Sequence, residues 1–315
     1  MATINSRFSS AIIIIIWEIL PLLDGYLFVR LSMSTAHNMQ PTDVAKLTIR
    51  ATDKSWSLNW GEFWQHRELL YFLTWRDIKV RYKQTVLGVV WAVMQPLAIA
   101  LALTVFFGRV VHMPSDNLPY PVFAYAGMVL WQFFAQALTE SSNSVVANER
   151  LISKVYFPRI FVPLSAILAS LLDLVVSLLV LALFLAWFHI APSAPIVLLP
   201  FFVLPAVLTS LGAGLWLSAL NVKFRDVRYT VNFLMQFWFF ATPIAYPTSS
   251  VPVRLRLLFS LNPMVGIVDG FRWTLRPEGA FPAQSFTLAV FTATVLLMTG
   301  VYYFRRTEDT FADFI

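Results

Sequence analysis

Residues 75–96, WRDIKVRYKQTVLGVVWAVMQP, join a basic segment of the chain to a hydrophobic one. Four cations precede the boundary: Arg76, Lys79, Arg81 and Lys83. Beyond it, no residue from Val86 to Phe107 carries a charge. Anionic lipid headgroups hold cations of this kind at the cytoplasmic face of a membrane. The stretch therefore predicts a first transmembrane helix that the chain enters from the cytoplasm.

The composition of the whole chain indicates the same class of protein. Hydrophobic residues make up 58% and charged residues 13% of the 315 residues, and the mean hydropathy is +0.69, whereas soluble domains carry about 25% charged residues. The net charge of +6 does not indicate a nucleic-acid partner, because the cations cluster beside apolar segments, where lipid phosphate is nearer. With no cysteine and no pair of histidines at helical spacing, we expect no disulfide and no metal site.

Six apolar segments are the candidates for membrane-spanning helices, which need about 20 residues. They are Leu87–Phe107, Tyr120–Leu138, Ile160–Phe188, Ile196–Leu220, Val231–Tyr246 and Phe286–Phe304. The expected fold is therefore an all-helical integral membrane protein, with six transmembrane helices in a membrane domain at 86–305 and a cytoplasmic tail at 306–315.

Cations in the connecting segments set the expected orientation. Those in the segments expected inside are Arg150, Lys154, Arg159, Lys223, Arg225, Arg228, Arg305 and Arg306. The first two segments expected outside carry only Arg109. The positive-inside rule therefore predicts that both termini lie in the cytoplasm.

The last expected outside segment, 247–284, departs from this rule. Its four arginines are Arg254, Arg256, Arg272 and Arg276. The segment is too polar to span and too apolar to be a free loop, and Asn262 before Pro263 is a good helix start. Asp269 stands three residues before Arg272, close enough to pair with it on one helix face. We expect two short helices that dip back towards the outer leaflet, or an interfacial lid without contact to a substrate.

The first 85 residues divide into a tail, 1–57, and an amphipathic helix, 58–85. Between Gly61 and Lys83, apolar and aromatic residues recur at helical spacing with charges between them, which is typical of a helix lying in the membrane interface. We interpret residues 1–32 as an over-long translated start, with Met33 or Met39 as the initiator; an additional membrane anchor is the alternative.

The expected inside loop 140–160 predicts a short amphipathic helix that begins near Asn148 and ends before Pro158. Its apolar and basic faces suit docking to a cytosolic partner, although such loops often only connect two spans. The sequence contains no G-x-x-x-x-G-K-[ST] phosphate loop, so nucleotide chemistry must come from a partner. Asp173 lies well inside a predicted span, and we interpret it as a hydrogen-bonding residue between helices, beside Ser170 and Ser177.

Aromatic and amide side chains within the spans are candidates for a surface that contacts a substrate. We expect a channel to be lined by Gln95, Tyr125, Gln132, Phe134, Asn232, Gln236, Phe237 and Phe240. Rings pack on the C–H faces of ligands, and amides bind hydroxyls. The rings also fit lipid-facing interface belts, whereas a lipid-facing glutamine is costly.

Several segments resemble one family in the same order along the chain: WRDIKVRYKQTVLGVVWAVMQPL, YPVFAYAGMVLWQFFAQALTESSNSVVANERLISKVYFPR, LNVKFRDVRY and LNPM. They are similar to the permease subunits of ABC-type polysaccharide exporters, which move O-antigen, capsule or teichoic-acid chains. The resemblance covers about Trp60 to Phe304.

This resemblance implies two permeases working with two copies of a cytosolic ATPase, which holds the ATP and Mg²⁺, so this chain itself needs no cofactor. Leu58–Tyr82 would be the interface helix, and Val251–Leu275 would be outer gate helices containing Arg254, Arg256, Asp269 and Arg272. The basic collar of Arg76, Lys79, Arg81 and Lys83 would face the pyrophosphate of a polyprenyl-linked substrate or ordinary lipid headgroups. Asn143–Tyr156 would couple to the ATPase through Asn143, Asn148, Glu149, Arg150, Leu151, Lys154 and Tyr156.

The expected function is that of a homodimeric, non-enzymatic permease in the bacterial cytoplasmic membrane, which exports lipid-linked polysaccharide. One alternative is a small-molecule or drug exporter of the same superfamily. A membrane-embedded glycan ligase or polymerase is less favoured, since the 247–284 segment offers few acids to act as catalysts.

Overall fold

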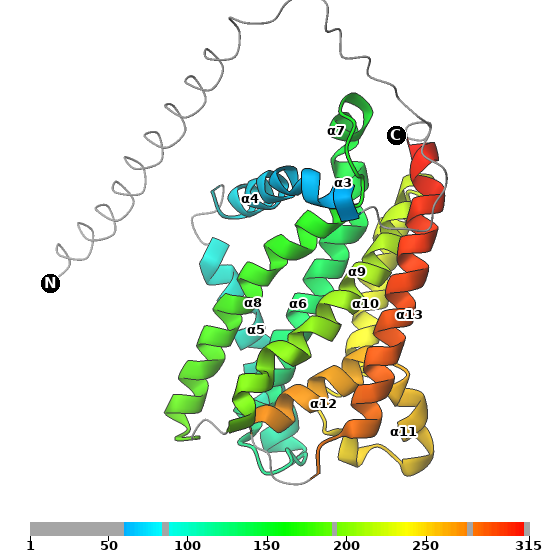
Figure 1. Ribbon diagram of the computed structural model, residues 1–315. Coiled ribbons are helices and arrows are strands. Elements are labelled where there is room, and N and C mark those ends of the chain that lie inside the picture. Colours follow the sequence, from blue (N-terminus) through cyan, green and yellow to red (C-terminus); the bar gives the residue numbers. More distant parts are fainter. Residues whose placement is uncertain (1–59, 84–87, 191–193, 276–279, 312–315) are drawn as a thin grey trace, which may run out of the picture. The chain divides into compact units, whose positions relative to one another are not determined.

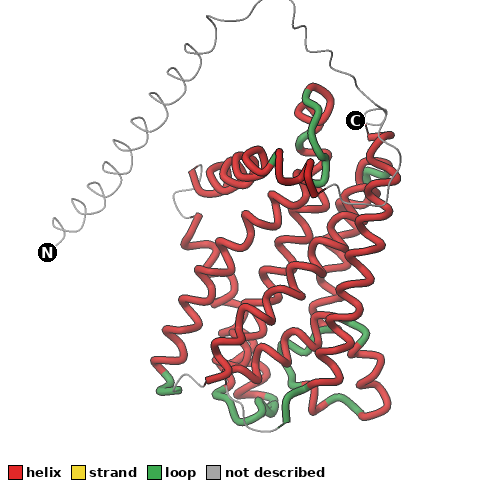
Figure 2. The backbone as a smooth tube through the Cα atoms, in the orientation of Figure 1, coloured by secondary structure: helices red, strands yellow, loops and turns green. Residues whose placement is uncertain are grey.

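The computed structural model describes residues 60–83, 88–190, 194–275 and 280–311. These residues form helices joined by turns, and none of them lies in a strand (Figure 1, Figure 2). The predicted all-helical class is thereby confirmed. The interpretations made for residues 1–57 and for the end of the C-terminal tail, 312–315, lie outside the described residues.

Five long helices have the length and composition to cross a membrane, so the chain is a multi-pass membrane protein. These helices are α5 (Gly88–Leu103), which continues into the π-helix η1 (Thr104–Val110), α6 (Tyr120–Ala147), α8 (Phe161–Trp187), α9 (Leu199–Lys223) and α13 (Ala283–Thr307). The fifth predicted span corresponds to α10 (Val227–Ala241), which has 15 residues and is shorter than the roughly 20 that a spanning helix needs.

Shorter helices gather at the two ends of this bundle (Figure 1). One end, called here the α4 end, carries α3 (Trp60–Gln65), α4 (Arg67–Lys83), α7 (Glu149–Lys154) and η4 (Glu308–Thr310). The other, the α12 end, carries η2 (Ala194–Leu198), η3 (Thr248–Ser250), α11 (Val253–Ser260) and α12 (Pro263–Leu275). The predicted start of α12 is confirmed, since Asn262 Oδ1 accepts a hydrogen bond from the backbone N–H of Met264 at 3.0 Å.

Helix α6 forms the centre of the core. It packs against α5, α8, α9, α10 and α12, and 78% of its most apolar stretch is buried, compared with 17% for the first span. The helix continues nine residues beyond the predicted end of its span at Leu138. The hydroxyls of Ser142 and Ser144 donate to backbone carbonyls three residues earlier, so these two side chains are satisfied within the helix.

Among the described helices, α9 and α13 share the most extensive contact and run side by side (Figure 1). A Cβ atom added at Gly300 would overlap the backbone carbonyl of Gly212, and one added at Gly212 would overlap the backbone between Leu296 and Leu297. Small residues of this kind let helices approach until their backbones touch, which is the main source of packing energy between helices in lipid.

We predict that Gly300→Leu lowers the free energy of unfolding by about 3 kcal/mol, because a side chain cannot fit between two backbones and overpacking is destabilising. Thermal unfolding of the purified protein in detergent measures the effect. Met298→Leu, at a position on α13 that is 68% exposed, is the control and should leave the transition unchanged. A Gly300→Leu protein that unfolds at the wild-type temperature would contradict this account of the contact.

Candidate functional site

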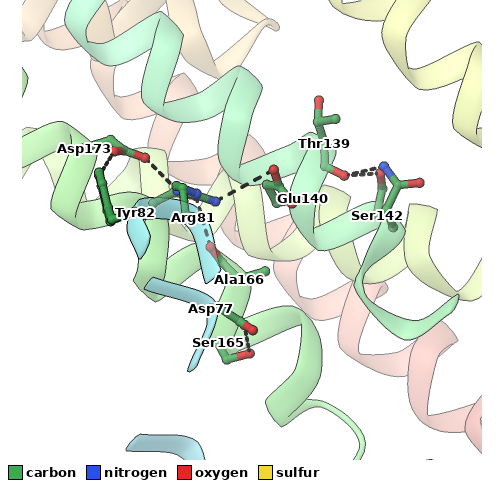
Figure 3. Close-up of polar contacts among 11 residues, drawn as sticks. Asp77, Arg81, Tyr82, Thr139, Glu140, Ser142, Ser165, Ala166 and Asp173 are labelled. Carbon is green, nitrogen blue, oxygen red and sulfur yellow. Dashed lines mark hydrogen bonds and ion pairs between the residues drawn. The ribbon is translucent and has the colours of Figure 1, made fainter. Parts of the chain in front are cut away.

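A cluster of polar side chains joins α4 to α6 and α8 (Figure 3). Arg81 Nη1 lies 2.6 Å from Asp173 Oδ2, and Arg81 Nη2 lies 3.8 Å from Glu140 Oε1. The Tyr82 hydroxyl donates to the other carboxylate oxygen of Asp173. These four residues are called the Arg81 cluster below.

The helical periodicities of α4 and α8 explain why these side chains meet. Asp77 and Arg81 are four residues apart and share one face of α4, while Ser165 and Asp173 are eight apart and share one face of α8. The Ser165 hydroxyl donates to Asp77 Oδ2 at 2.9 Å. Two polar contacts about two helical turns apart on α8 therefore fix how α4 lies along it.

Burial makes Arg81 essential to the cluster. The Asp173 side chain is only 8% exposed, and a carboxylate buried within an apolar helix is strongly unfavourable without an opposite charge and hydrogen bonds. Burial raises the pKa of the Tyr82 phenol, and its hydrogen bond to Asp173 raises it further, so Tyr82 remains a neutral donor. Asp173 does bond between helices, as predicted, but its partners come from α4 and not from the nearby serines.

The four cations of the predicted basic collar do not share one environment. Arg76 forms an ion pair with Asp77 at 2.7 Å, and Arg81 belongs to the cluster. The Lys79 ammonium lies 5.5 Å from the centre of the Trp75 ring, while the Lys83 side chain is exposed. Binding of a headgroup or pyrophosphate by these residues stays a prediction.

Helix α7 projects from the α4 end, beyond the long helices (Figure 1). Ile152 and Phe157 are buried and anchor it. The exposed side chains around them are those of Glu149, Arg150, Lys154 and Tyr156, with Tyr156 85% exposed; that of Leu151 is partly buried. The helix predicted after Asn148 is thereby confirmed, and its exposed face is accessible to a protein partner.

Asn143 and Asn148, also predicted to couple to the ATPase, lie on or directly after α6. Asn143 accepts a hydrogen bond from Asn221 at 3.1 Å and donates to the Thr139 carbonyl, and Asn148 donates to the Ser144 carbonyl. Both amides therefore bond within the bundle at the base of α7.

The residues predicted to line a channel separate into two groups. Gln95 on α5 and four residues on α10 are exposed: Asn232, Gln236, Phe237 and Phe240. Tyr125 and Phe134 are fully buried; Tyr125 stacks on Phe184 with ring centres 5.0 Å apart, and Phe134 meets the Trp238 ring edge-on. Gln132 is partly buried. In this conformation the two buried rings belong to the core, and the exposed amides and rings gather on α10.

At the α12 end, Arg272 is buried beneath the outer helices. Its guanidinium donates to the backbone carbonyls of Phe123, Pro243 and Ile244 at 2.6–3.2 Å and lies 3.5 Å from the centre of the Phe123 ring. The expected pairing of Asp269 with Arg272 is present as a charge attraction between the two side chains, but the hydrogen bonds of the guanidinium go to the carbonyls of Phe123 and of the break after α10. Arg254 is exposed, and Arg256 donates to the carbonyls of Ser249 and Val251.

We predict that Arg272→Lys destabilises the protein by about 3 kcal/mol, since an ammonium cannot reach the carbonyls that the planar guanidinium reaches and leaves some of them unpaired. Thermal unfolding in detergent measures the loss. Arg254→Lys, an exposed change on the neighbouring helix, should leave the transition in place; equal transitions for the two variants would contradict the role given to Arg272.

Comparison with known proteins places this geometry in a family. The family model described as ABC-2 type transporter matches residues 68–275, which include α4, α7 and the outer helices. The chain is 30% identical over 249 residues to the O-antigen export system permease protein RfbA of Klebsiella pneumoniae, covering 79% of this chain and 95% of that protein.

Two further relatives are similar to this chain over most of its length. The RfbA protein of Myxococcus xanthus is 30% identical over 257 residues, or 81% of this chain and 98% of that protein. The polysialic acid transport protein KpsM of Escherichia coli is 26% identical over 243 residues, or 74% of this chain and 91% of that protein. The match extends over more than half of the chain and over nearly the whole length of these relatives. The chain therefore belongs to the ABC-2 type transporter family.

Proposed function

We propose that the chain is the transmembrane permease of an ATP-driven exporter, which moves lipid-linked polysaccharide of the O-antigen or capsule type across the bacterial cytoplasmic membrane. The observation that carries the proposal is the near-complete coverage of relatives named for O-antigen export and polysialic acid transport. The projecting α7 and the exposed amides and rings of α10 suit the two tasks of such a permease, which are to bind an ATPase and to pass sugars.

In the proposed topology, α10 is the fifth of six spans in chain order, and the α4 end is cytoplasmic. Helix α9 ends at the α4 end and α11 begins at the α12 end, so α10 and the irregular residues 242–247 together cover the distance between them (Figure 1). The cations of the cytoplasmic segments gather at the α4 end, as the positive-inside rule requires.

A separate cytosolic ATPase would supply the energy and hold ATP and Mg²⁺. The exposed Glu149, Arg150 and Lys154 of α7, and Tyr156 just after it, offer charged and aromatic contacts on a segment short enough to enter a cleft in that partner. Since α7 follows α6 after a single residue, force on α7 acts directly on the central helix of the core.

A second copy of the chain would cover the exposed face of α10. Asn232 and Gln236 are costly in contact with lipid, and a homodimer that pairs these faces places them along a shared aqueous path. Phe237 and Phe240 line the same face, where rings pack against sugars in a sequence-tolerant way. Such a path holds many sugars loosely, as the export of a long polymer requires.

The function is tested by deleting the gene from its host and analysing surface glycan on a gel, together with lipid-linked polymer in the cytoplasm. We expect the surface chain to disappear and the polymer to accumulate inside, with both restored by the plasmid-borne gene. An unchanged surface glycan would refute polysaccharide export and favour a small-molecule exporter of the same family.

We also predict that Tyr156→Ala and Glu149→Arg separate ATP hydrolysis from export, because they alter exposed side chains of α7 and of the residues directly after it without changing the buried Ile152 and Phe157. Polymer exported per ATP hydrolysed should fall at least severalfold in the reconstituted complex. Ser153→Ala, an exposed change on the same helix, is the matched control. Normal export by both variants would remove α7 from the coupling path.

A further inference from the structure

The Arg81 guanidinium is a junction of three helices. It binds Asp173 of α8 and Glu140 of α6 from its own position near the end of α4 (Figure 3). The backbone of α4 runs close to that of α8 but approaches that of α6 at few points. The long side chain of Arg81 therefore provides a polar connection between two helices that otherwise make little contact.

The two ion pairs of Arg81 differ in strength. The Arg81–Asp173 ion pair has an N···O distance of 2.6 Å, and the Asp173 side chain is 8% exposed. The Arg81–Glu140 ion pair has an N···O distance of 3.8 Å, and the Glu140 side chain is 53% exposed. A buried carboxylate cannot lose its counter-charge without a large penalty, but an exposed pair at this distance is weak and breaks readily. Asp173 is thus the fixed anchor and Glu140 the exchangeable partner.

The position of Glu140 on α6 explains how the ion pair between Glu140 and Arg81 could break and re-form. Glu140 lies nine residues before Glu149, and α6 is helical from Glu140 to Ala147, immediately before α7. A rigid helix carries displacement along its length. A partner that moves α7 therefore also moves the Glu140 carboxylate relative to Arg81, which stays with Asp173.

We infer that Arg81 is a positioning residue for transport: anchored on Asp173, it binds Glu140 in one state of the transport cycle and releases it in the other. The contact between α6 and α4, which stays on α8, thereby changes with the movement of α6. Asp77 with Ser165 keeps α4 on α8 in both states, and Arg76 is held by Asp77 and does not compete for Glu140. The inference rests on the proposed function, because an ATPase provides the movement.

Glu140→Gln is the first test, since it removes the exposed charge while the buried pair remains intact. In proteoliposomes with the ATPase, we expect wild-type ATP hydrolysis but severalfold less polymer transported per ATP. Glu68→Gln, an exposed change on α4, is the matched control and should behave as wild type. A merely structural defect lowers both rates in proportion to folded protein, and wild-type transport per ATP by Glu140→Gln would overturn the inference.

The double variant Arg81→Met with Asp173→Asn is the second test, because it removes both charges and leaves no buried carboxylate without a partner. We expect it to fold and to bind the ATPase, yet to transport severalfold less polymer per ATP. Arg81→Lys keeps the charge next to Asp173 and should retain part of the coupling. Wild-type coupling in the double variant would mean that the pair only holds the fold together.

A third measurement does not depend on the substrate. The sequence has no cysteine, so Phe72→Cys on α4 and Val146→Cys on α6, both exposed, give two unique sites for spin labels. We expect ATP to change the distance between the labels, and Glu140→Gln to alter that change. Identical label distances in the wild type and in Glu140→Gln, each with and without ATP, would overturn the inference. A wild-type complex that exports no polysaccharide would instead refute the proposed function, and the label distances would still test the junction.

Discussion

A chain in lipid must pair each backbone N–H and C=O within the protein, and the arrangement of helices follows from this requirement. The long helices meet it through their own hydrogen bonds. The difficult place is the break after α10, where Pro243 and Ile244 present carbonyls without helical partners. Arg272 meets the need by reaching back from α12 to both of them and to Phe123 of α6. One buried side chain thus joins the outer helices to the central one.

Charge imposes the complementary constraint at the α4 end. Asp173 is tolerable within an apolar helix because α4 brings a guanidinium and a phenol to it. The same pairing keeps part of the cationic collar away from lipid phosphate. Buried ion pairs are weak sources of stability, which favours a role for this one in fixing the geometry of α4, α6 and α8.

Sequence reasoning succeeded where the signal was local. Continuous apolar runs predicted five of the long helices, and Asn262 with Pro263 and the segment after Asn148 predicted the starts of α12 and α7. It failed where the outcome depends on distant residues. Arg81 and Asp173 are 92 positions apart, and no spacing rule joins them; Tyr125 and Phe134 are buried by rings on other helices. The local spacing also predicted the attraction between Asp269 and Arg272, but not the backbone carbonyls from two other parts of the chain that accept the hydrogen bonds of Arg272.

The contact between Gly212 and Gly300 also bears on how the protein is made. It joins α9, from the middle of the sequence, to α13, which is synthesised about 60 residues later. Before α13 enters the membrane, α9 has no backbone to close against, and the glycine surface around Gly212 stays open to lipid or to chaperones. This contact therefore forms only after α13 has entered the membrane, and a chain that stops short of α13 would present an unfinished surface to quality-control proteases.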